Sequence, residues 1–322
     1  MTKLVYHPQY NIGFFGLENL HPFDSKKYGR SYRTLQKQFG QQLTQHLLQP
    51  PHPVRRSTLL QLHSPTYLKQ LTSARYAAQV LEIPPIRYLP GCLVDALVLK
   101  RMRWATQGTI LAAQAAFSSG LAINLAGGYH HAKPAAGEGF CAYADIALAI
   151  TTARNEGLLD KTDSIAYIDL DAHQGNGVCH CFLDDKTVHI FDMYNQDIYP
   201  AHDTVARQRI DWDVPLATGC ATQPYLDTLK EELPNFLASL ANESKTPSFA
   251  IYNAGTDVFE QDPLGQLGIS ATGILERDLF VINLLRQKKI PTIMLLSGGY
   301  TDQSYQLVAN TVQRLLREDE GE

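Results

Sequence analysis

A short apolar run ends abruptly in charged and polar residues at Ile165-Ala166-Tyr167-Ile168-Asp169-Leu170-Asp171-Ala172-His173. Four apolar residues in a row are typical of a β-strand that is buried on both faces. The same pattern, an apolar run before a polar or glycine-rich cluster, recurs at residues 122–125, 188–191, 249–252 and 292–296. Helical stretches lie between several of these runs, at residues 104–117, 143–156 and 274–286. This alternation predicts an α/β fold in which helices cover both faces of a parallel sheet.

The composition is that of a soluble globular protein, since 44% of the 322 residues are apolar and 19% are charged. No repeat, low-complexity segment or charged linker divides the chain, so we expect one domain over residues 1–322. Within it, the acidic residues 318–322 are expected to form a solvated tail. The five scattered cysteines do not make a disulfide framework, and we expect free, mostly buried thiols.

The charge balance argues against polyanionic partners. Lys and Arg number 28 against 32 Asp and Glu, which leaves a net charge of −4 and no electrostatic reason to bind nucleic acid or an anionic membrane. No apolar run approaches the ~20 residues that span a bilayer, and the first residues lack the apolar stretch of a secretion signal. We therefore expect a cytoplasmic location, with no direct nucleic-acid partner and no membrane span.

Titratable side chains gather at the predicted strand ends. Asp169, Asp171 and His173 follow one strand and Asp257 follows another. In open α/β sheets ligands bind outside the carboxyl ends of the strands, and two carboxylates with one imidazole are the donor set of a catalytic zinc site that keeps one position open. Because residues i and i+2 of an extended strand point the same way, Asp171 and His173 are expected to face one ion, with Asp169 a step further along that face.

Two other strand ends add His130, His131 and Tyr300. The histidine pair follows Gly127-Gly128, where the backbone can approach a ligand closely. Taken singly, each aspartate is explained as a helix cap and each histidine as a paired core group. Four strand ends that all supply titratable groups favour a functional site.

Two further patterns match known motifs, but we do not expect them to bind a dinucleotide or a metal. Residues 137–142 spell the G-x-G-x-x-A dinucleotide signature, but they lie too far from the preceding strand, and Glu138 would place a carboxylate where a pyrophosphate must bind. Cys179-His180-Cys181 suggests a metal knuckle, yet zinc thiolate sites normally use two separated pairs, so we expect packing residues there. The chain has no G-x-S-x-G elbow, H-E-x-x-H motif or P-loop.

Four segments together resemble the zinc-dependent histone deacetylase family, and most closely its class IV branch. They are Gly127-Gly128-Tyr129-His130-His131, Gly139-Phe140-Cys141-Ala142-Tyr143-Ala144-Asp145, Asp169 to Gly177, and Ser297-Gly298-Gly299-Tyr300. An early stretch, Tyr10-Asn11-Ile12 through Gly16-Leu17-Glu18 to Leu20-His21-Pro22-Phe23-Asp24, is also similar to class IV. The resemblance covers nearly the whole chain.

The resemblance implies the arginase/deacetylase fold, a single catalytic domain with a mostly parallel eight-stranded sheet between helices. It implies one catalytic Zn²⁺ on Asp171, His173 and Asp257, and a structural K⁺ on the segment with Asp169, Asp171, His173 and Asp192. It also implies a narrow substrate tunnel, whose matching wall positions are Gly139, Phe140, Tyr199 and Leu264.

The resemblance further assigns catalytic roles to His130, His131 and Tyr300. His131 would take a proton from water and return it to the leaving amine, and Tyr300 would stabilise the negative oxygen of the intermediate beside the metal. Asn176 stands where many members carry an aspartate that orients one histidine. An amide accepts a hydrogen bond without adding negative charge, so that histidine should protonate less readily, whereas His130 is expected to keep a charged partner in Asp169.

Three functions remain open. The favoured one is a zinc-dependent hydrolase that removes acyl groups from lysine side chains of peptides or proteins. The class IV resemblance implies a preference for long fatty acyl chains over acetyl. A second is hydrolysis of small acylated amines such as acetylpolyamines. A third is a weakly active scaffold that binds acylated partners, against which the presence of every expected catalytic residue argues.

Overall fold

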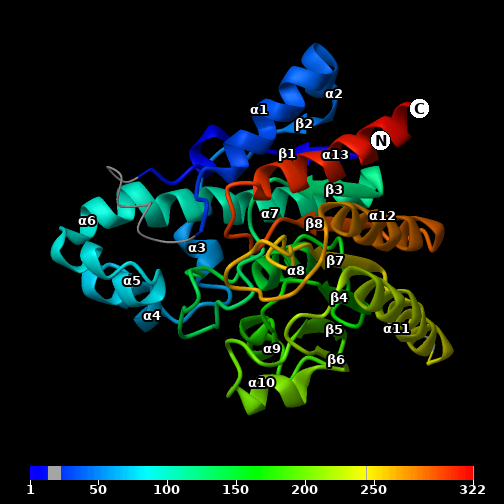
Figure 1. Cartoon of the computed structure of the whole chain (residues 1–322). Coiled ribbons are helices and arrows are strands. Elements are labelled where there is room, and N and C mark those ends of the chain that lie inside the picture. Colours follow the sequence, from blue (N-terminus) through cyan, green and yellow to red (C-terminus); the bar gives the residue numbers. More distant parts are fainter. Residues whose placement is uncertain (14–22, 244, 322) are drawn as a thin grey trace.

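One sheet of eight strands forms the centre of the protein in the computed structural model, which describes residues 1–13, 23–243 and 245–321 (Figure 1). The strand order is β2-β1-β3-β8-β7-β4-β5-β6, and every neighbouring pair is parallel. The strands are β1 (Lys3–Val5), β2 (Leu47–Leu48), β3 (Leu121–Asn124), β4 (Ile165–Asp169), β5 (Val188–Asn195), β6 (Trp212–Leu216), β7 (Phe249–Asn253) and β8 (Thr292–Leu295). Most of the early stretch that resembles class IV, residues 14–22, lies outside the described residues.

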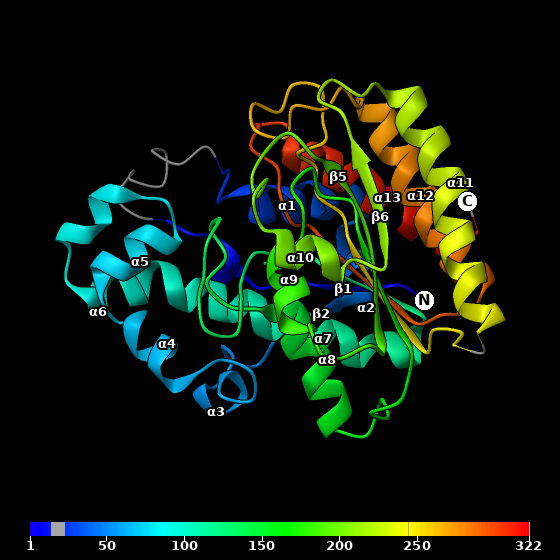
Figure 2. The same ribbon diagram turned by 90° about the horizontal axis from the view of Figure 1, so that it is seen from below.

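Helices cover both faces of this sheet and make a three-layer, single-domain α/β fold (Figure 2). One layer consists of α1 (Lys27–Phe39), α11 (Thr222–Asn242), α12 (Ala271–Gln287) and α13 (Ser304–Glu320). The opposite layer consists of α7 (Lys100–Ser119), α8 (Asp145–Asn155) and α9 (Asn176–Cys181). The predicted α/β architecture with a parallel sheet between helices is therefore confirmed.

Short helices complete the chain. Four of them, α3 (Arg56–Leu59), α4 (Pro65–Gln70), α5 (Ala74–Val80) and α6 (Gly91–Val94), extend from the N-terminal end of α7 (Figure 1). The others are α2 (Leu43–His46) and α10 (Thr204–Arg209). Single turns of other helix types are η1 (Pro8–Tyr10), η3 (Gly40–Gln42), η4 (Pro84–Tyr88) and η5 (Asp95–Leu99).

The five apolar runs of the sequence all form strands, and the three predicted helices form α7, α8 and α12. β3, β4, β7 and β8 are buried along their whole length, as expected of strands covered on both faces. The sequence pattern missed β1, β2 and β6. β1 and β2 are only three and two residues long, and β6 contains Pro215, which an edge strand tolerates because its missing N–H breaks no ladder.

The strand order brings four separate loops to one place. β3, β8, β7 and β4 are direct neighbours, so the loops that follow them leave the sheet side by side. Their last residues align in one row, in which Asn124 pairs with Leu295, Leu295 with Asn253, and Asn253 with Asp169. Asp169 in turn pairs with Asp192 of β5. The polar residues Asn124, Asn253, Asp169 and Asp192 therefore lie in one row at the carboxyl ends of the central strands.

The acidic end of the chain is not a solvated tail, contrary to the sequence prediction. α13 continues through Glu320, and two of its acidic side chains pair with Arg286 of α12. Glu318 Oε2 lies 3.3 Å from Arg286 Nη1, and Asp319 Oδ1 lies 3.1 Å from Arg286 Nη2. Asp319 also accepts a hydrogen bond from the backbone N–H of Thr2. The charges are therefore used to join α13 to α12 and to the start of the chain, and residue 322 lies outside the described residues.

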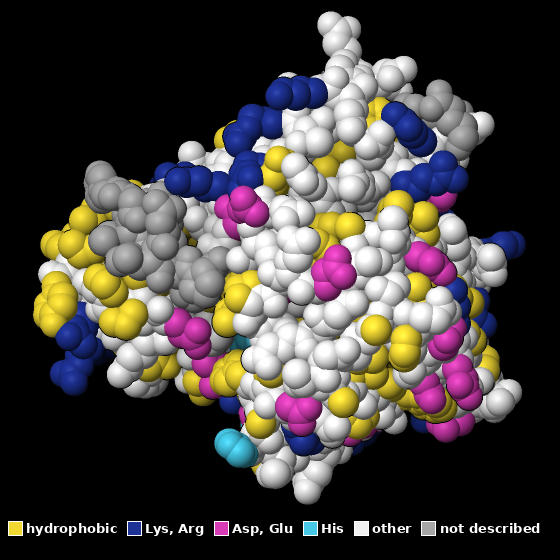
Figure 3. Space-filling model, viewed as in Figure 1, with side chains coloured by type: hydrophobic (Ala, Val, Ile, Leu, Met, Phe, Trp, Pro, Cys, Tyr) yellow, Lys and Arg dark blue, Asp and Glu magenta, His cyan; other side chains and the backbone are white. Residues whose placement is uncertain are grey.

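The five cysteines are all free, as predicted, but only Cys141 and Cys179 are buried, while Cys92 is exposed. No helix among the described residues is long and apolar enough to cross a membrane. On the face shown in Figure 3, basic side chains gather toward the top over α1 and acidic ones toward α11 and α12. Neither sign of charge covers this face as a whole.

Candidate active site

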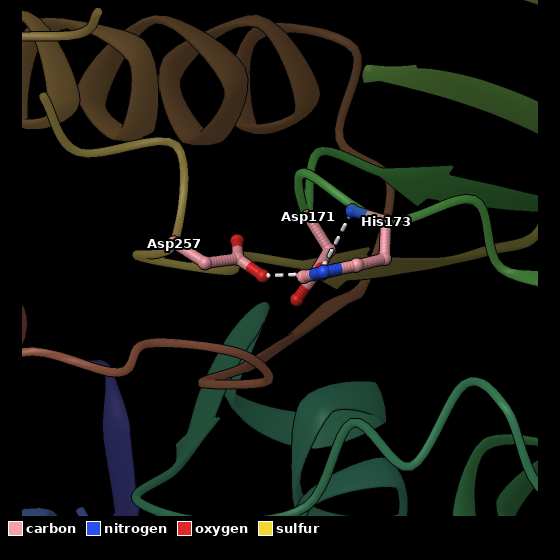
Figure 4. A group of neighbouring side chains, drawn as sticks. All are labelled: Asp171, His173 and Asp257. Atoms are coloured by element: carbon pink, nitrogen blue, oxygen red, sulfur yellow. Dashed lines mark hydrogen bonds and ion pairs between the residues drawn. The ribbon is translucent and has the colours of Figure 1, made fainter. Parts of the chain in front are cut away.

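Three buried side chains from the loops after β4 and β7 point toward one another (Figure 4). His173 Nδ1 lies 3.1 Å from Asp171 Oδ1 and 2.9 Å from Asp257 Oδ2. Each carboxylate is oriented through its other oxygen, because Asp257 Oδ1 accepts a hydrogen bond from Ala172 N at 2.9 Å and Asp171 Oδ2 accepts one from Gly298 N at 2.8 Å. One oxygen of each aspartate is thus left to face the imidazole nitrogen.

The route by which Asp171 and His173 converge differs from the sequence prediction. β4 ends at Asp169, so these residues are not on an extended strand. They lie in a turn in which Asp171 Oδ1 accepts a hydrogen bond from the backbone N–H of His173 at 3.0 Å. Asp169 is not a member of the Asp171, His173 and Asp257 group, which we call the ligand group. Its Oδ2 lies 2.8 Å from His130 Nδ1 instead.

The Asp171, His173 and Asp257 donors fit a divalent metal. A ring nitrogen carries at most one proton, so His173 Nδ1 cannot donate fully to two carboxylates. Donor atoms of a tetrahedral zinc site lie about 3.3 Å apart, close to the 2.9 and 3.1 Å found here. Burial and the negative charge of Asp171 raise the pKa of Asp257 to about 7, as expected of two carboxylates buried side by side.

Glycine makes the close approach of these carboxylates possible. A Cβ at Gly298 would lie 2.2 Å from Asp257 Oδ2 and 2.6 Å from Asp171 Oδ2. A Cβ at Gly255 would lie 2.4 Å from Asp171 Oδ2. Side chains at these two positions would displace the donor atoms, so the glycines of the β7 and β8 loops are required by the site.

The two neighbouring histidines have different partners. The His130 and His131 ring centroids lie 4.1 Å apart. Burial disfavours the charged form of His130, but the charges of Asp169 and Asp171 outweigh this effect and raise its pKa to about 9. His131 Nδ1 lies 2.8 Å from the amide oxygen of Asn176, which adds no charge. Burial and the positive charges of neighbouring histidines hold the pKa of His131 well below its usual range.

Tyr300, in the loop after β8, completes this group. Its ring centroid lies 5.9 Å from that of His173, and its backbone N–H donates to Asp262 Oδ2 at 2.7 Å. Burial and the charge of Asp257 raise the pKa of the Tyr300 hydroxyl well above its usual range. The hydroxyl is therefore a proton donor in hydrogen bonds at neutral pH.

One cleft leads to these residues, and it contains all four positions assigned to a tunnel. Its volume is about 560 Å³, and its walls include Gly139, Phe140, Tyr199 and Leu264 together with His131, His173 and Tyr300. Glu82 and Asp197, which the sequence did not single out, also line it. A second, much smaller cavity of about 30 Å³ lies beside His130 and Tyr300 and is bordered by Phe23, Tyr28 and Phe140.

Several residues that support the site were missed in the sequence. Asp145, the first residue of α8, holds the turn before the histidine pair by accepting hydrogen bonds from Gly128 N at 2.9 Å and Tyr129 N at 2.8 Å. Asn253, the last residue of β7, donates to Asp169 Oδ1 at 2.9 Å. Asp145 ends the segment 139–145 that carries part of the family resemblance, and Asn253 directly follows the apolar run at 249–252. Both could therefore have been singled out as candidate site residues from the sequence.

Lys27 is a buried lysine near the site that no sequence pattern indicated. Its Nζ donates to Ser297 O at 2.6 Å and Gly298 O at 2.8 Å, which fixes the turn before Tyr300. Burial lowers the pKa of Lys27 to about 8, although Asp257 and Asp171 oppose the shift. A lysine at the start of α1 is ordinary in sequence, and only the packing of α1 places it here.

Asp169 and Asp192 form a second buried acidic pair beneath the ligand group. They are register partners on β4 and β5, and both are fully buried. Asp192 Oδ2 accepts a hydrogen bond from Gly175 N at 2.9 Å, while Asp192 Oδ1 has no hydrogen-bond partner among the described residues. Burial and the charge of Asp169 raise the pKa of Asp192 well above its usual range, so this position suits a bound cation.

Among the described residues, neither the Cys-His-Cys segment nor the glycine-rich stretch at 137–142 contributes to the metal group. Within the part of the chain that the structure describes, Asp171, His173 and Asp257 are the one group of His, Cys, Asp or Glu side chains spaced to hold a metal. Cys179 is buried and Cys181 partly buried, and His180 Nε2 lies 2.9 Å from Asp203 Oδ2. Residues 139 and 140 of the glycine-rich stretch form part of the cleft wall.

Arg277 of α12 joins the two loops that carry the ligand group. Its Nη1 donates to Gly255 O at 2.7 Å and to Leu170 O at 3.1 Å, next to Asp171. Its Nη2 lies 2.8 Å from Asp278 Oδ1, and both side chains are almost fully buried. Arg277 therefore sets the spacing between the β4 and β7 loops.

We expect Arg277→Met to weaken the binding of added Zn²⁺ to this candidate site about 10–100-fold, because the residue that sets the spacing of the two loops is lost. The free energy of unfolding should fall by about 3–5 kcal/mol, since Asp278 is left buried without its cation. Competition with a chromophoric chelator measures the affinity, and thermal unfolding measures the stability.

The matched control is Arg314→Met, which removes an arginine that is half exposed and paired within α13. It should change neither quantity. Arg277→Lys retains the charge but not the planar fork of donors, so a folded Arg277→Lys protein that binds zinc like the unmodified one would contradict the proposed spacing role.

The comparisons with known proteins agree with this geometry. The family model described as "Histone deacetylase domain" matches residues 21–316. Histone deacetylase 2 of Arabidopsis thaliana is 42% identical over 317 residues, which cover 98% of this chain and 79% of that protein. An uncharacterized protein of Picosynechococcus sp. is 33% identical over 305 residues, covering 95% of this chain and 94% of the relative.

Solved structures show the same fold at lower identity. The crystal structure of the HDA15 HD domain superposes with a TM-score of 0.72 at 17% identity, covering 98% of this chain and 87% of that one. An HDAC homolog complexed with SAHA superposes with a TM-score of 0.71 at 22% identity, covering 98% of this chain and 83% of that one. From the family model and the near full-length relatives, we conclude that the chain belongs to the histone deacetylase family of hydrolases.

Proposed function

We propose that the protein is a zinc-dependent lysine deacylase, which hydrolyses the amide bond between an acyl group and the side-chain nitrogen of a lysine in a peptide or protein. The observation that carries the proposal is the meeting of His131, His173 and Tyr300 in the wall of one cleft, where His173 belongs to the buried group with Asp171 and Asp257. With a volume of about 560 Å³, the cleft has room for the side chain of an acylated lysine.

Asp171, His173 and Asp257 would hold the zinc ion. When bound in such a site, zinc polarises a carbonyl oxygen and lowers the pKa of water towards about 7. Tyr300 would donate its hydroxyl proton in a hydrogen bond to the oxygen on which negative charge develops. Because the pKa of Tyr300 is raised, this hydrogen remains in place at neutral pH.

His131 would move the proton. Water adds to the amide carbon, its proton passes to His131 Nε2, and His131 returns the proton to the lysine nitrogen as the C–N bond breaks. A base must be neutral to accept a proton, and the pKa of His131 is lowered by burial and by nearby positive charge. His130, whose pKa is raised to about 9, would instead stay charged beside Asp169.

We also propose a structural potassium ion on the segment with Asp169, Asp171, His173 and Asp192. The support is the buried Asp169 and Asp192 pair and the unpaired Asp192 Oδ1 within the described residues. A monovalent cation there would offset negative charge without competing for the His173 nitrogen.

Two finer proposals concern the substrate. The early stretch that resembles class IV supports placement in that branch, and with it a preference for long fatty acyl chains. Phe140, Tyr199 and Leu264 offer apolar surface in the cleft wall. The cavity beside His130 and Tyr300 measures only about 30 Å³, so a long chain must displace side chains such as Phe23 to enter it.

Small acylated amines are the second candidate substrate class. Glu82 and Asp197 are exposed carboxylates in the cleft wall, where they would attract a polycationic amine. The same carboxylates would also attract a basic peptide, so this observation favours cationic substrates of either kind.

If Tyr300 donates to the oxyanion, Tyr300→Phe should lower kcat by roughly 10²–10³ with little change in KM, as expected of an interaction made mainly in the transition state. Steady-state kinetics on an acyl-lysine peptide measures both parameters. Tyr305→Phe is the control, because Tyr305 lies on α13 outside the cleft and should behave like the unmodified protein. An unchanged kcat in Tyr300→Phe would remove Tyr300 from the reaction.

We expect myristoyl-lysine peptide to be hydrolysed with a higher kcat/KM than acetyl-lysine peptide. Each buried methylene contributes up to ~0.8 kcal/mol, but ordering the chain and widening the small cavity oppose this gain. The measurement compares acetyl, octanoyl and myristoyl versions of one peptide, together with an acetylpolyamine, below the micelle concentration. Equal or higher efficiency on acetyl peptide indicates an ordinary deacetylase, and highest efficiency on the polyamine indicates the small-amine enzyme.

A further inference from the structure

The side-chain amide of Asn176 has only one possible orientation. Its Nδ2 lies 2.6 Å from Glu138 Oε1 and 3.1 Å from Asp203 Oδ2. The carboxylate oxygens accept hydrogen bonds, so the NH₂ end of the amide must face them. The amide oxygen is therefore the atom that lies 2.8 Å from His131 Nδ1.

This orientation fixes the proton on His131. An amide oxygen only accepts hydrogen bonds, so His131 Nδ1 must carry the hydrogen that it receives. In the neutral ring, Nε2 then keeps its lone pair. That is the form a general base needs, because Nε2 is the nitrogen left to act on water.

The two carboxylates belong to a wider network that keeps them in place. Lys133 Nζ bridges them, at 3.0 Å from Glu138 Oε1 and 3.1 Å from Asp203 Oδ2. Asp203 also caps α10 by accepting a hydrogen bond from Ala206 N at 3.1 Å, and His180 Nε2 lies 2.9 Å away. Although burial opposes its charge, these hydrogen bonds hold the pKa of Asp203 well below its usual range.

We propose that Asp203 and Glu138 are positioning residues for catalysis, which act through the Asn176 amide to hold His131 in the tautomer with a free Nε2. The inference rests on the proposed role of His131 as the base. His130 Nδ1 contacts the Asp169 carboxylate directly. His131 Nδ1 instead contacts the neutral Asn176 amide, whose other end is held by the Glu138 and Asp203 carboxylates. His180 and Lys133, which the sequence left without a function, serve to hold Asp203.

Asp203→Asn tests the proposal with little effect on the fold, because asparagine also caps helices well. The change removes one of the two carboxylates that fix the Asn176 amide, while Glu138 still accepts from its NH₂ group at 2.6 Å, so we expect kcat to fall by a few-fold to roughly tenfold with KM unchanged. Glu138→Gln removes the other carboxylate from a position that caps no helix, and it should lower kcat in the same way. The two changes together should cost more than either alone.

Asn176→Asp separates positioning from structural support. Here the carboxylate itself accepts from His131 Nδ1, so Asp203 is no longer needed and becomes a nearby like charge. In this background, Asp203→Asn should leave kcat unchanged or raise it. A purely structural role for Asp203 predicts the same loss in both backgrounds, and that result would overturn the proposal.

Asp185→Asn is the matched control. Asp185 pairs with Arg154 at 2.6 Å, is partly buried like Asp203, and lies outside the cleft. It should change kcat in neither background. Melting temperatures of all variants show whether any loss of activity comes from unfolding.

Long-range ¹H–¹⁵N spectra of the histidine rings provide a readout that does not depend on activity. We expect His131, assigned by comparison with His131→Gln, to be in the Nδ1–H form and to lose this preference when Asp203→Asn and Glu138→Gln are combined. An Nε2–H form in a protein that turns over substrate refutes the positioning role. The Nδ1–H form in a protein without any amide hydrolysis supports the network and refutes the proposed function.

Discussion

Four buried aspartates crowd the carboxyl edge of the sheet, and the need to compensate their charge dictates what surrounds them. They are Asp169, Asp171, Asp192 and Asp257, all fully buried. An unpaired charge in the interior is costly, so each carboxylate receives backbone N–H groups, imidazoles or an amide. The strand order β3-β8-β7-β4 makes this possible, because it places four loops with different donors next to one another. The divalent cation proposed between Asp171, His173 and Asp257 would complete the compensation.

Buried cations from one helical layer hold these loops through their carbonyl groups. Lys27 of α1 binds the carbonyls of Ser297 and Gly298, and Arg277 of α12 binds those of Leu170 and Gly255. The two helices belong to the same layer (Figure 2). Lys27 lies close enough to interact electrostatically with Asp257 and Asp171. His131, His173 and Tyr300 line the cleft, where the proposed substrate would bind.

The sequence predicted the central strands and the residues that follow them because burial on both faces leaves a strong apolar pattern. It could not predict that β8 lies between β3 and β7, since strand order depends on how helices pack. β1 and β2 are too short to produce a recognisable apolar run. The acidic end was wrongly predicted to be a solvated tail because its partner, Arg286, lies about thirty residues earlier in the chain. Asp171 and His173 were paired correctly, but through a turn rather than an extended strand. Asn176 was recognised as unusual, while Glu138 and Asp203 behind it were visible only in three dimensions.

If zinc binds to the Asp171, His173 and Asp257 group, its nearest neighbours are one imidazole nitrogen and oxygen atoms. X-ray absorption at the zinc edge, on protein loaded with one equivalent of zinc, identifies these neighbours. We expect nitrogen and oxygen only, with the signature of one imidazole. Sulfur neighbours at about 2.3 Å would place the metal on cysteine, such as Cys179 or Cys181, and would rule out the aspartate and histidine group as the zinc site.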